Sequence, residues 1–181
     1  MVTTKLLTAQ DLWNLGDQGD NLELIRGELV KVSPPSAAHA ATMTNVALLI
    51  GNFVKAHRLG RLYTGDAGVV LEHDPDTVLG PDLAFLTADR VPEVQSVYIH
   101  LPPDLTIEIV SPGNAAREIE RKIGIYLSTG VREVWIVDPA KRQVVVHSLA
   151  ASPRTHHAGD HLSGGDILPG LSIAVDDIFD F

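Results

Sequence analysis

Cysteine is absent from this chain of 181 residues, so disulfide bonds and thiolate metal sites are both excluded. Long apolar runs are absent too, since no segment approaches the ~18 consecutive apolar residues that span a bilayer. The first residues, MVTTKLLTAQDLW, lack the apolar core and small-residue cleavage site of a secretory signal. We therefore expect a cytoplasmic protein without a membrane partner.

Positive charge is scarce. The chain has 14 Lys and Arg residues against 23 Asp and Glu, and its net charge of -9 argues against coating nucleic acid through a broad basic face. The same acidic balance is compatible with a carboxylate-rich site for a divalent cation. No glycine-rich phosphate loop and no Ser–His–Asp signature stands out, so nucleotide-binding and serine-hydrolase classes are not indicated.

The residues that are present have a globular balance of 45% hydrophobic and 20% charged, which fits one domain over residues 1–181 with a sizeable core. Periodicity and turn residues predict helices at Ala9–Leu15, Ala37–His57 and between residues 110 and 131. They predict strands at residues 22–25, 28–32, 61–63, 67–72, 78–86, 104–110, 131–137, 143–149 and 171–175. Residues 150–165 are predicted to be a polar connection. Strands and helices alternate only in the middle, which indicates an α/β fold with a mixed sheet flanked by helices.

The centre of the chain, residues 104–139, is predicted to form a strand, a helix and a second strand in a right-handed parallel crossover. The first strand contains TIEIV, an apolar run that Glu108 interrupts. Burying a carboxylate without partners costs several kcal/mol. Glu108 is therefore either a strand-end residue that reaches solvent or an arginine, or a metal ligand near the carboxyl end of a central strand.

The helix of this unit carries a second costly charge. At about 100° per residue, Glu118 and Lys122 fall inside the apolar arc, whereas Glu120 and Arg121 take the opposite face. Lys122 could extend from the rim of the arc and pair with Glu118. Because Glu108 lies on the adjoining strand, the alternative is that Lys122 and Glu108 meet in one cleft.

A third acid, Asp82, follows Pro81 and precedes the apolar run LAFL. A single Pro-Asp most often marks a turn, and Asp104 is expected to be a turn aspartate. Together with Glu108, however, Asp82 supplies carboxylates on neighbouring strands, a donor set that suits Mg²⁺ or Mn²⁺. Such a metal stabilises an attacked phosphate and lowers the pKa of a bound water, and Lys122 can stabilise phosphoryl charge or help orient and deprotonate the water.

Pro81-Asp82, Glu108 and the lysine resemble the PD-(D/E)XK nuclease superfamily, which has the restriction-endonuclease-like fold. The usual motif places its lysine two residues after the second acid, where this chain has Val110. A lysine displaced onto the following helix, at Lys122, would restore the geometry. From about residue 22 onward, the chain is similar to the Uma-type family of bacterial endonucleases in the segments ELIRGELVKVSPPSAAH, GPDLAFL, PPDLTIEIVSP, KIGIYLSTGV, EVWIVDP and LPGL.

This resemblance implies a metal-dependent nuclease site in which Asp82 and Glu108 hold Mg²⁺ or Mn²⁺ and Lys122 completes the catalytic set. It also implies residues that support the site, namely Glu28, with Glu23 as the alternative, His39 and Glu118.

Several basic and histidine side chains are further candidates. Arg117 and Arg121 lie on the helix beside the proposed site and could bind phosphate. Residues 55–61 form the densest basic cluster, although a helix C-terminus also favours cations. The histidines of residues 156–161 have a spacing that could bind a transition metal, but their Gly-rich surroundings favour a solvated loop.

These observations predict a metal-dependent endonuclease that hydrolyses phosphodiester bonds in DNA, with a homodimer as a plausible assembly because cutting two strands requires two sites. Three alternatives stay open. The chain could be a catalytically silent nuclease-fold module that binds nucleic acid or a protein partner. It could hydrolyse another phosphate ester, or Glu108 and Lys122 could form a buried ion pair with a structural role.

Overall fold

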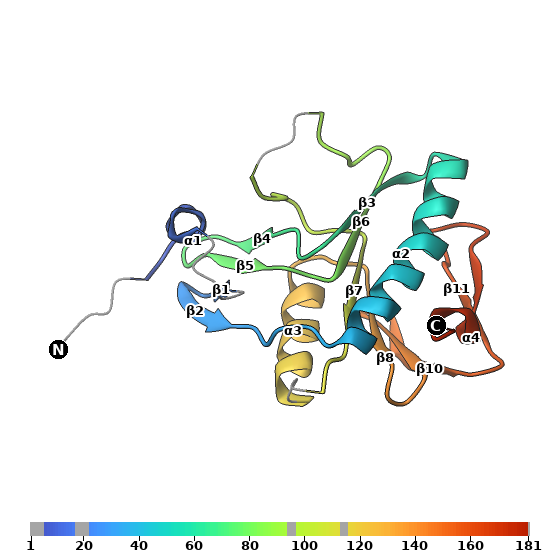
Figure 1. The fold of residues 1–181 in the computed structure, drawn as a ribbon. Helices are drawn as coiled ribbons and strands as arrows, with labels where there is room; N and C mark the ends of the chain where they lie inside the picture. The colour runs from blue at the N-terminus through green and yellow to red at the C-terminus, as the bar shows by residue number, and fades with distance from the viewer. Residues whose placement is uncertain (1–5, 17–21, 94–96, 113–115, 181) are drawn as a thin grey trace.

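The computed structural model describes residues 6–16, 22–93, 97–112 and 116–180 (Figure 1). In chain order, its helices and strands are α1 (Ala9–Leu15), β1 (Leu22–Ile25), β2 (Glu28–Lys31), α2 (Ala37–His57), β3 (Gly60–Thr64), β4 (Val69–Glu72), β5 (Thr77–Leu79), β6 (Leu83–Thr87), β7 (Leu105–Ile109), α3 (Ala116–Ser128), β8 (Glu133–Asp138), β9 (Gln143–Ser148), β10 (Ala151–His157), β11 (His161–Ser163), β12 (Ser172–Ala174) and α4 (Val175–Ile178).

A six-stranded sheet in the order β10-β9-β8-β7-β6-β3 forms the centre of the fold, and a four-stranded sheet, β2-β1-β5-β4, and a two-stranded sheet, β11-β12, accompany it. Strands β7 and β8 pair in parallel, from Leu105 opposite Glu133 to Ile109 opposite Val137, and α3 connects them. The other pairs of this sheet are antiparallel. The predicted mixed sheet with flanking helices and its strand–helix–strand centre are therefore confirmed.

The helices α2 and α3 cover opposite faces of the six-stranded sheet. Because neighbouring side chains of a strand point to opposite faces, consecutive residues of β7 face different helices. Ile107 and Ile109 of β7 belong to the core cluster that includes the buried side of α2. On the other face, Tyr126 of α3 packs in a cluster with Ile136 of β8. Glu108 lies between the two isoleucines and therefore points toward α3.

Among the described helices, α2 is the one that is long and apolar enough to cross a membrane by length and composition, with a mean hydropathy of 1.2. This differs from the expectation that no segment approaches that limit, because alanines raise the mean hydropathy without forming a continuous apolar run. In this fold α2 packs on the six-stranded sheet and buries Val46, Ile50 and Val54.

Two predicted segments are wrong. Residues 78–86, expected to form one strand, are divided into β5 and β6, which belong to different sheets. Gly80 and Pro81 separate them, and Pro81 cannot donate to a strand ladder. Residues 150–165, expected to be a connection, form β10 and β11, so their histidines lie on strands.

Asp104, which the sequence predicts to be an ordinary turn aspartate, is a buried structural residue of which only 1% is accessible. The amide and hydroxyl of Thr87 donate to its Oδ2 at 2.9 and 3.1 Å, and Arg90 and Arg132 approach Oδ1 at 2.7 and 3.4 Å. Burial raises the pKa of Asp104, but these hydrogen bonds and the Arg90 charge outweigh it, so the pKa lies below its usual value. Asp104 thus fixes the end of β6 to the start of β7.

Replacing Asp104 by asparagine is expected to lower the free energy of unfolding at pH 7 by about 2–3 kcal/mol, because two guanidinium groups lose their anionic partner. The folded-state pKa lies below the unfolded value of about 3.9. This part of the stability is therefore present above that pH and is lost as the pH falls toward the folded-state pKa.

Urea unfolding of both proteins at pH 7 and pH 3 measures this effect, and Asp89→Asn, at an exposed position nearby, serves as the matched control. The difference between wild type and Asp104→Asn should shrink at the lower pH. An unchanged difference would show that the charge of Asp104 contributes nothing.

Candidate active site

Asp82 lies where the chain passes from the four-stranded to the six-stranded sheet, directly before β6. The amide of Ile109, at the end of β7, donates to its Oδ2 at 2.6 Å. Its Oδ1 lies 2.9 Å from Nε2 of His39, in the first turn of α2. Asp82 is 6% exposed, and its carboxylate is held from two sides, so it has a fixed orientation.

Glu108 is the second-last residue of β7, and its carboxylate contacts two side chains of α3. The hydroxyl of Tyr126 donates to Oε1 at 2.6 Å, and Nζ of Lys122 lies 3.3 and 3.4 Å from the two oxygens. Burial raises the pKa of Glu108, and the charges of Asp82 and Glu23 add to this effect, whereas Lys122 and the hydrogen bond from Tyr126 lower it. The net pKa is about 7. A divalent cation would relieve this concentration of negative charge.

Lys122 is shared by two acids. Its Nζ lies 2.8 Å from Oε1 of Glu23 as well as near Glu108, and the residue is 8% exposed. Burial alone lowers the pKa of this amine, but the two carboxylates outweigh it and the net pKa is raised above its usual value. Lys122 is therefore an ammonium at neutral pH, which suits it to stabilising negative charge and not to accepting a proton.

The acid from the first hairpin that reaches this cluster is Glu23 and not Glu28, which was the preferred residue. Glu23 on β1 is 5% exposed and accepts the amide of Gly80 at 3.0 Å on the same oxygen that contacts Lys122. Glu28 lies beyond the turn on the edge strand β2, opposite Ile25, and its side chain is exposed. The structure therefore favours the alternative assignment.

The remaining predicted residues lie around this cluster. Glu118 is half-buried and borders, together with Val110 and Lys122, a small hollow of about 20 Å³ next to Glu108. That volume is sufficient for one water molecule. Val110, at the position where the usual motif has its lysine, and Lys122, the displaced lysine, therefore line the same hollow. Arg117 and Arg121 are both exposed on α3.

His39, on α2, contacts the carboxylate of Asp82 through Nε2. Burial lowers its pKa, but the hydrogen bond and charge of Asp82 outweigh that effect, so the net pKa is raised. Its Nδ1 is buried and makes no hydrogen bond within the described part of the chain. The arrangement makes His39 a residue that orients Asp82.

Two residues of the site were not predicted. Tyr126 follows Lys122 by four residues, so it lies on the same helix face, but its ring looks like an ordinary core residue. Asp66 comes from the turn between β3 and β4, where burial and the charge of Asp82 raise its pKa. No sequence pattern marked it, because its proximity to Asp82 arises only from the tertiary fold.

The donor set can be compared with the needs of a divalent metal. Asp82 and Glu108 offer carboxylate oxygens, which Mg²⁺ and Mn²⁺ prefer, and water commonly completes such a shell. Across residues 6–16, 22–93, 97–112 and 116–180, no three His, Asp or Glu side chains form a group that could hold a metal ion. The chemistry of the two carboxylates fits Mg²⁺, with most of the coordination sphere left to water and substrate.

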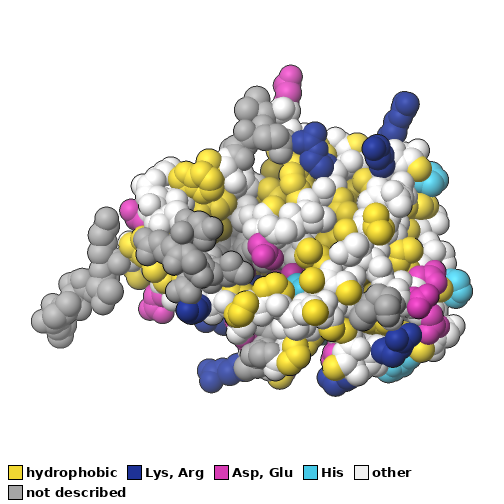
Figure 2. All heavy atoms as spheres, in the orientation of Figure 1, with side chains coloured by type: hydrophobic (Ala, Val, Ile, Leu, Met, Phe, Trp, Pro, Cys, Tyr) yellow, Lys and Arg dark blue, Asp and Glu magenta, His cyan; other side chains and the backbone are white. Residues whose placement is uncertain are grey.

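The surface around the site is not broadly basic. Figure 2 shows acidic side chains both near the centre and at the edges of the viewed face, whereas Lys and Arg side chains are scattered toward its margin. This distribution agrees with the net charge of -9. Any contact with nucleic acid would therefore depend on a few nearby Lys and Arg side chains and on a metal ion bound by the carboxylates.

The chain is similar to known proteins over nearly its whole length. The family model Uma2, with the description "Putative restriction endonuclease", matches residues 9–176. A crystal structure from Anabaena variabilis ATCC 29413, described as "a putative nuclease belonging to DUF820", matches with a TM-score of 0.85 and 21% sequence identity. The match covers 96% of this chain and 97% of that chain, and it confirms the fold. None of the curated proteins matches significantly.

Proposed function

Since this chain belongs to the Uma2 family, we propose that it is a metal-dependent endonuclease that hydrolyses phosphodiester bonds in DNA. The observation that supports this most directly is the convergence of Asp82, Glu108 and Lys122 at the junction of two sheets. Asp82 and Lys122 are buried there beside the largely covered Glu108, and a cluster of such costly charges is a candidate for a functional site.

Each residue of the cluster has a role in this proposal. Asp82 and Glu108 would hold Mg²⁺ or Mn²⁺, which supplies charge neutralisation at the phosphate and a lowered pKa for a bound water. Lys122 remains protonated and stabilises negative charge on the phosphoryl oxygens. Tyr126 holds the carboxylate of Glu108 in place through its hydrogen bond.

Residues outside the cluster assist substrate binding. His39 fixes Asp82, and Glu23 fixes the ammonium of Lys122. Arg117 and Arg121, exposed on α3, offer guanidinium groups to the phosphates that flank the bond to be cut. These roles require only short-range contacts and are compatible with an acidic protein.

A second candidate function is a catalytically silent module that keeps the fold and binds nucleic acid or a protein partner. One observation favours it. Both oxygens of Asp82 are already engaged, and both oxygens of Glu108 contact Lys122. In a protein that had lost metal binding, these oxygens would keep their protein partners at all times.

Cleavage assays separate the two functions. We expect the protein to nick supercoiled plasmid and to cut single-stranded DNA with Mg²⁺ or Mn²⁺, and to lose this activity in EDTA, because the carboxylates need a cation to bind phosphate oxygens. An RNA of the same sequence tests the preference for DNA. Inactivity on every nucleic acid, combined with no binding of Mg²⁺ or Mn²⁺ by calorimetry, would favour the silent module.

A further inference from the structure

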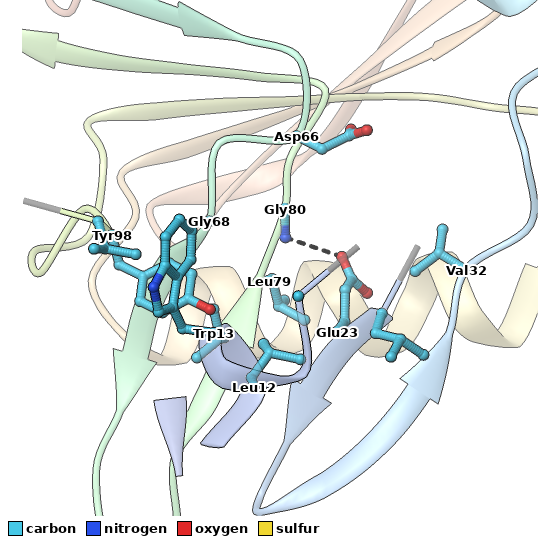
Figure 3. Close-up of a pocket in the computed structure, with 13 residues that line it drawn as sticks. Leu12, Trp13, Glu23, Val32, Asp66, Gly68, Leu79, Gly80 and Tyr98 are labelled. Carbon is cyan, nitrogen blue, oxygen red and sulfur yellow. Dashed lines mark hydrogen bonds between the residues drawn. The ribbon is translucent and has the colours of Figure 1, made fainter. Parts of the chain in front are cut away.

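A cleft of about 490 Å³ opens next to the proposed catalytic cluster (Figure 3). Its wall carries Trp13 and Tyr98, its floor includes Leu79 and Gly80, and Glu23 lies on the opposite side. The volume falls within the range of ~300–1,000 Å³ that small-molecule pockets usually have. None of the proposed catalytic roles uses the aromatic wall of this cleft.

The two aromatic rings of the wall are held in place by their packing. The rings of Trp13 and Tyr98 lie 6.1 Å apart at an interplanar angle of 83°, in an edge-to-face arrangement. Tyr98 packs on the bare backbone of Gly68, where an added Cβ would lie 2.5 Å from the ring. Trp13 is nevertheless 54% exposed. A large aromatic ring held in place and left open to solvent indicates a contact surface.

The helix that carries Trp13 is anchored on both sides of its N-cap residue, Thr8. The amide of Leu7 donates to the carbonyl of Gly27 at 2.9 Å, and the amide of Ala9 donates to Asp76 at 2.7 Å. Thr8 and Asp11 form a capping box that begins the helix. The exposure of Trp13 is therefore not caused by a loose helix.

The charges of the cleft restrict its ligand. Glu23 and Asp66 line it, and none of the described lining residues is Lys or Arg. A phosphate would be repelled by such a wall, whereas a neutral aromatic ring with an amino group would be compatible with it. Oε2 of Glu23 is buried and has no hydrogen-bond partner within the described residues, although the other oxygen is fully engaged. Carboxylates accept hydrogen bonds from the amino groups of nucleobases.

The cleft and the catalytic cluster share a residue. Glu23 lines the cleft, and its carboxylate lies 2.8 Å from Nζ of Lys122. Asp66 also lines the cleft and interacts electrostatically with Asp82 and Lys122. A group bound in the cleft would therefore sit beside the phosphate position that the cluster defines.

We infer that this cleft binds one unstacked nucleobase of the substrate, stacked on the ring of Trp13, which Tyr98 supports edge to face, and recognised through an exocyclic amino group by Glu23. The inference rests on the proposed nuclease function and adds a substrate class to it. A base enters such a cleft only from single-stranded DNA or after extrusion from a duplex. The preferred substrate is thus a nucleotide outside a regular helix.

Trp13 fluorescence provides a direct assay, because the chain has two tryptophans and Trp135 is 1% exposed. In Ca²⁺, a single-stranded 12-mer of deoxyadenosine should quench the wild-type signal. Trp13→Ala should bind this probe about 10-fold more weakly by anisotropy, since base–aromatic stacking contributes that much or more. Trp13→Phe should retain most of the affinity, and Leu48→Ala, at an exposed position on α2, should leave it unchanged.

A second comparison tests the amino group. Replacing adenine by purine in the 12-mer removes the amino group and keeps the stacking surface, so affinity for wild type should fall, whereas Trp13→Ala should not distinguish the two probes. Equal wild-type affinities for adenine and purine would overturn recognition by Glu23. Equal affinities of wild type and Trp13→Ala would overturn the base site, even if plasmid cleavage proceeds.

The reverse result separates this inference from the proposed function. Trp13-dependent binding of the 12-mer by a protein that cleaves no nucleic acid with Mg²⁺ or Mn²⁺ would support the base site and contradict the nuclease proposal. Quenching by a tyrosine-containing peptide, without quenching by the oligonucleotide, would overturn the base site in favour of a protein ligand.

Discussion

Replacing Glu108 by glutamine is expected to reduce Mg²⁺-dependent DNA cleavage at least about 100-fold. Loss of a residue that merely supports a metal ligand already costs roughly 10–100-fold, so loss of a direct ligand should cost more. Glutamine keeps the size of the side chain and can still accept the hydrogen bond from Tyr126, so the fold should survive. Initial rates on supercoiled plasmid, with circular dichroism as a check of folding, measure the effect.

The matched control for this substitution is Glu120→Gln, at an exposed position of α3, which should leave the cleavage rate unchanged.

The affinity of the protein for Mg²⁺ gives a second measurement. Because the pKa of Glu108 is about 7, Mg²⁺ affinity of the wild type should weaken as the pH falls through that value, when the carboxylate takes up a proton. Wild-type rates and unaltered Mg²⁺ binding in Glu108→Gln would remove Glu108 from the site.

Replacing Lys122 by methionine is expected to lower the free energy of unfolding by about 3–5 kcal/mol, in addition to abolishing cleavage. The substitution removes the ammonium that lies between the carboxylates of Glu23 and Glu108, so the two acids lose their shared cation. Removing one partner of a buried ion pair lowers stability by an amount of this size. Methionine keeps the length and packing of the side chain. Urea unfolding at pH 7 measures the stability change.

The control for Lys122 is the ion pair of Lys141 with Asp138, in which the carboxylate is buried but the lysine lies at the surface. Nζ of Lys141 lies 3.0 Å from Asp138, but the lysine side chain is 69% exposed, so Lys141→Met should cost no more than about 1 kcal/mol. Adding Glu23→Gln to Lys122→Met should recover part of the lost stability without recovering cleavage. Full stability of Lys122→Met alone would refute the ion-pair network, and full activity would refute the catalytic role of the lysine.

The elements with a strong local pattern could be predicted from the sequence. The helix α2 and the unit of β7, α3 and β8 were predicted because their apolar spacing is set by the same residues that pack. The division of residues 78–86 could not be predicted in this way. Apolar residues flank Gly80-Pro81-Asp82 on both sides, and only the pairing of β5 with β1 and of β6 with β7 places the two halves in different sheets.

The candidate site shows the same limit. Glu108 and Lys122 could be singled out because each is a charge inside an apolar pattern, and the structure brings them within 3.3 Å. Glu23 and Glu28 have similar neighbours in the sequence, and the choice between them depends on where the four-stranded sheet meets α3. Tyr126 carries its function in one hydroxyl, which no apolar pattern reveals.

The hydrogen bond from the Ile109 amide to Asp82 has a spectroscopic consequence. This backbone proton is held by an ionisable side chain and not by a neighbouring strand, at the point where β7 ends. Its chemical shift and its exchange with solvent therefore depend on the position of the Asp82 carboxylate and on whatever binds there. A single resonance in an amide NMR spectrum thus reports on the proposed metal ligand from inside the sheet.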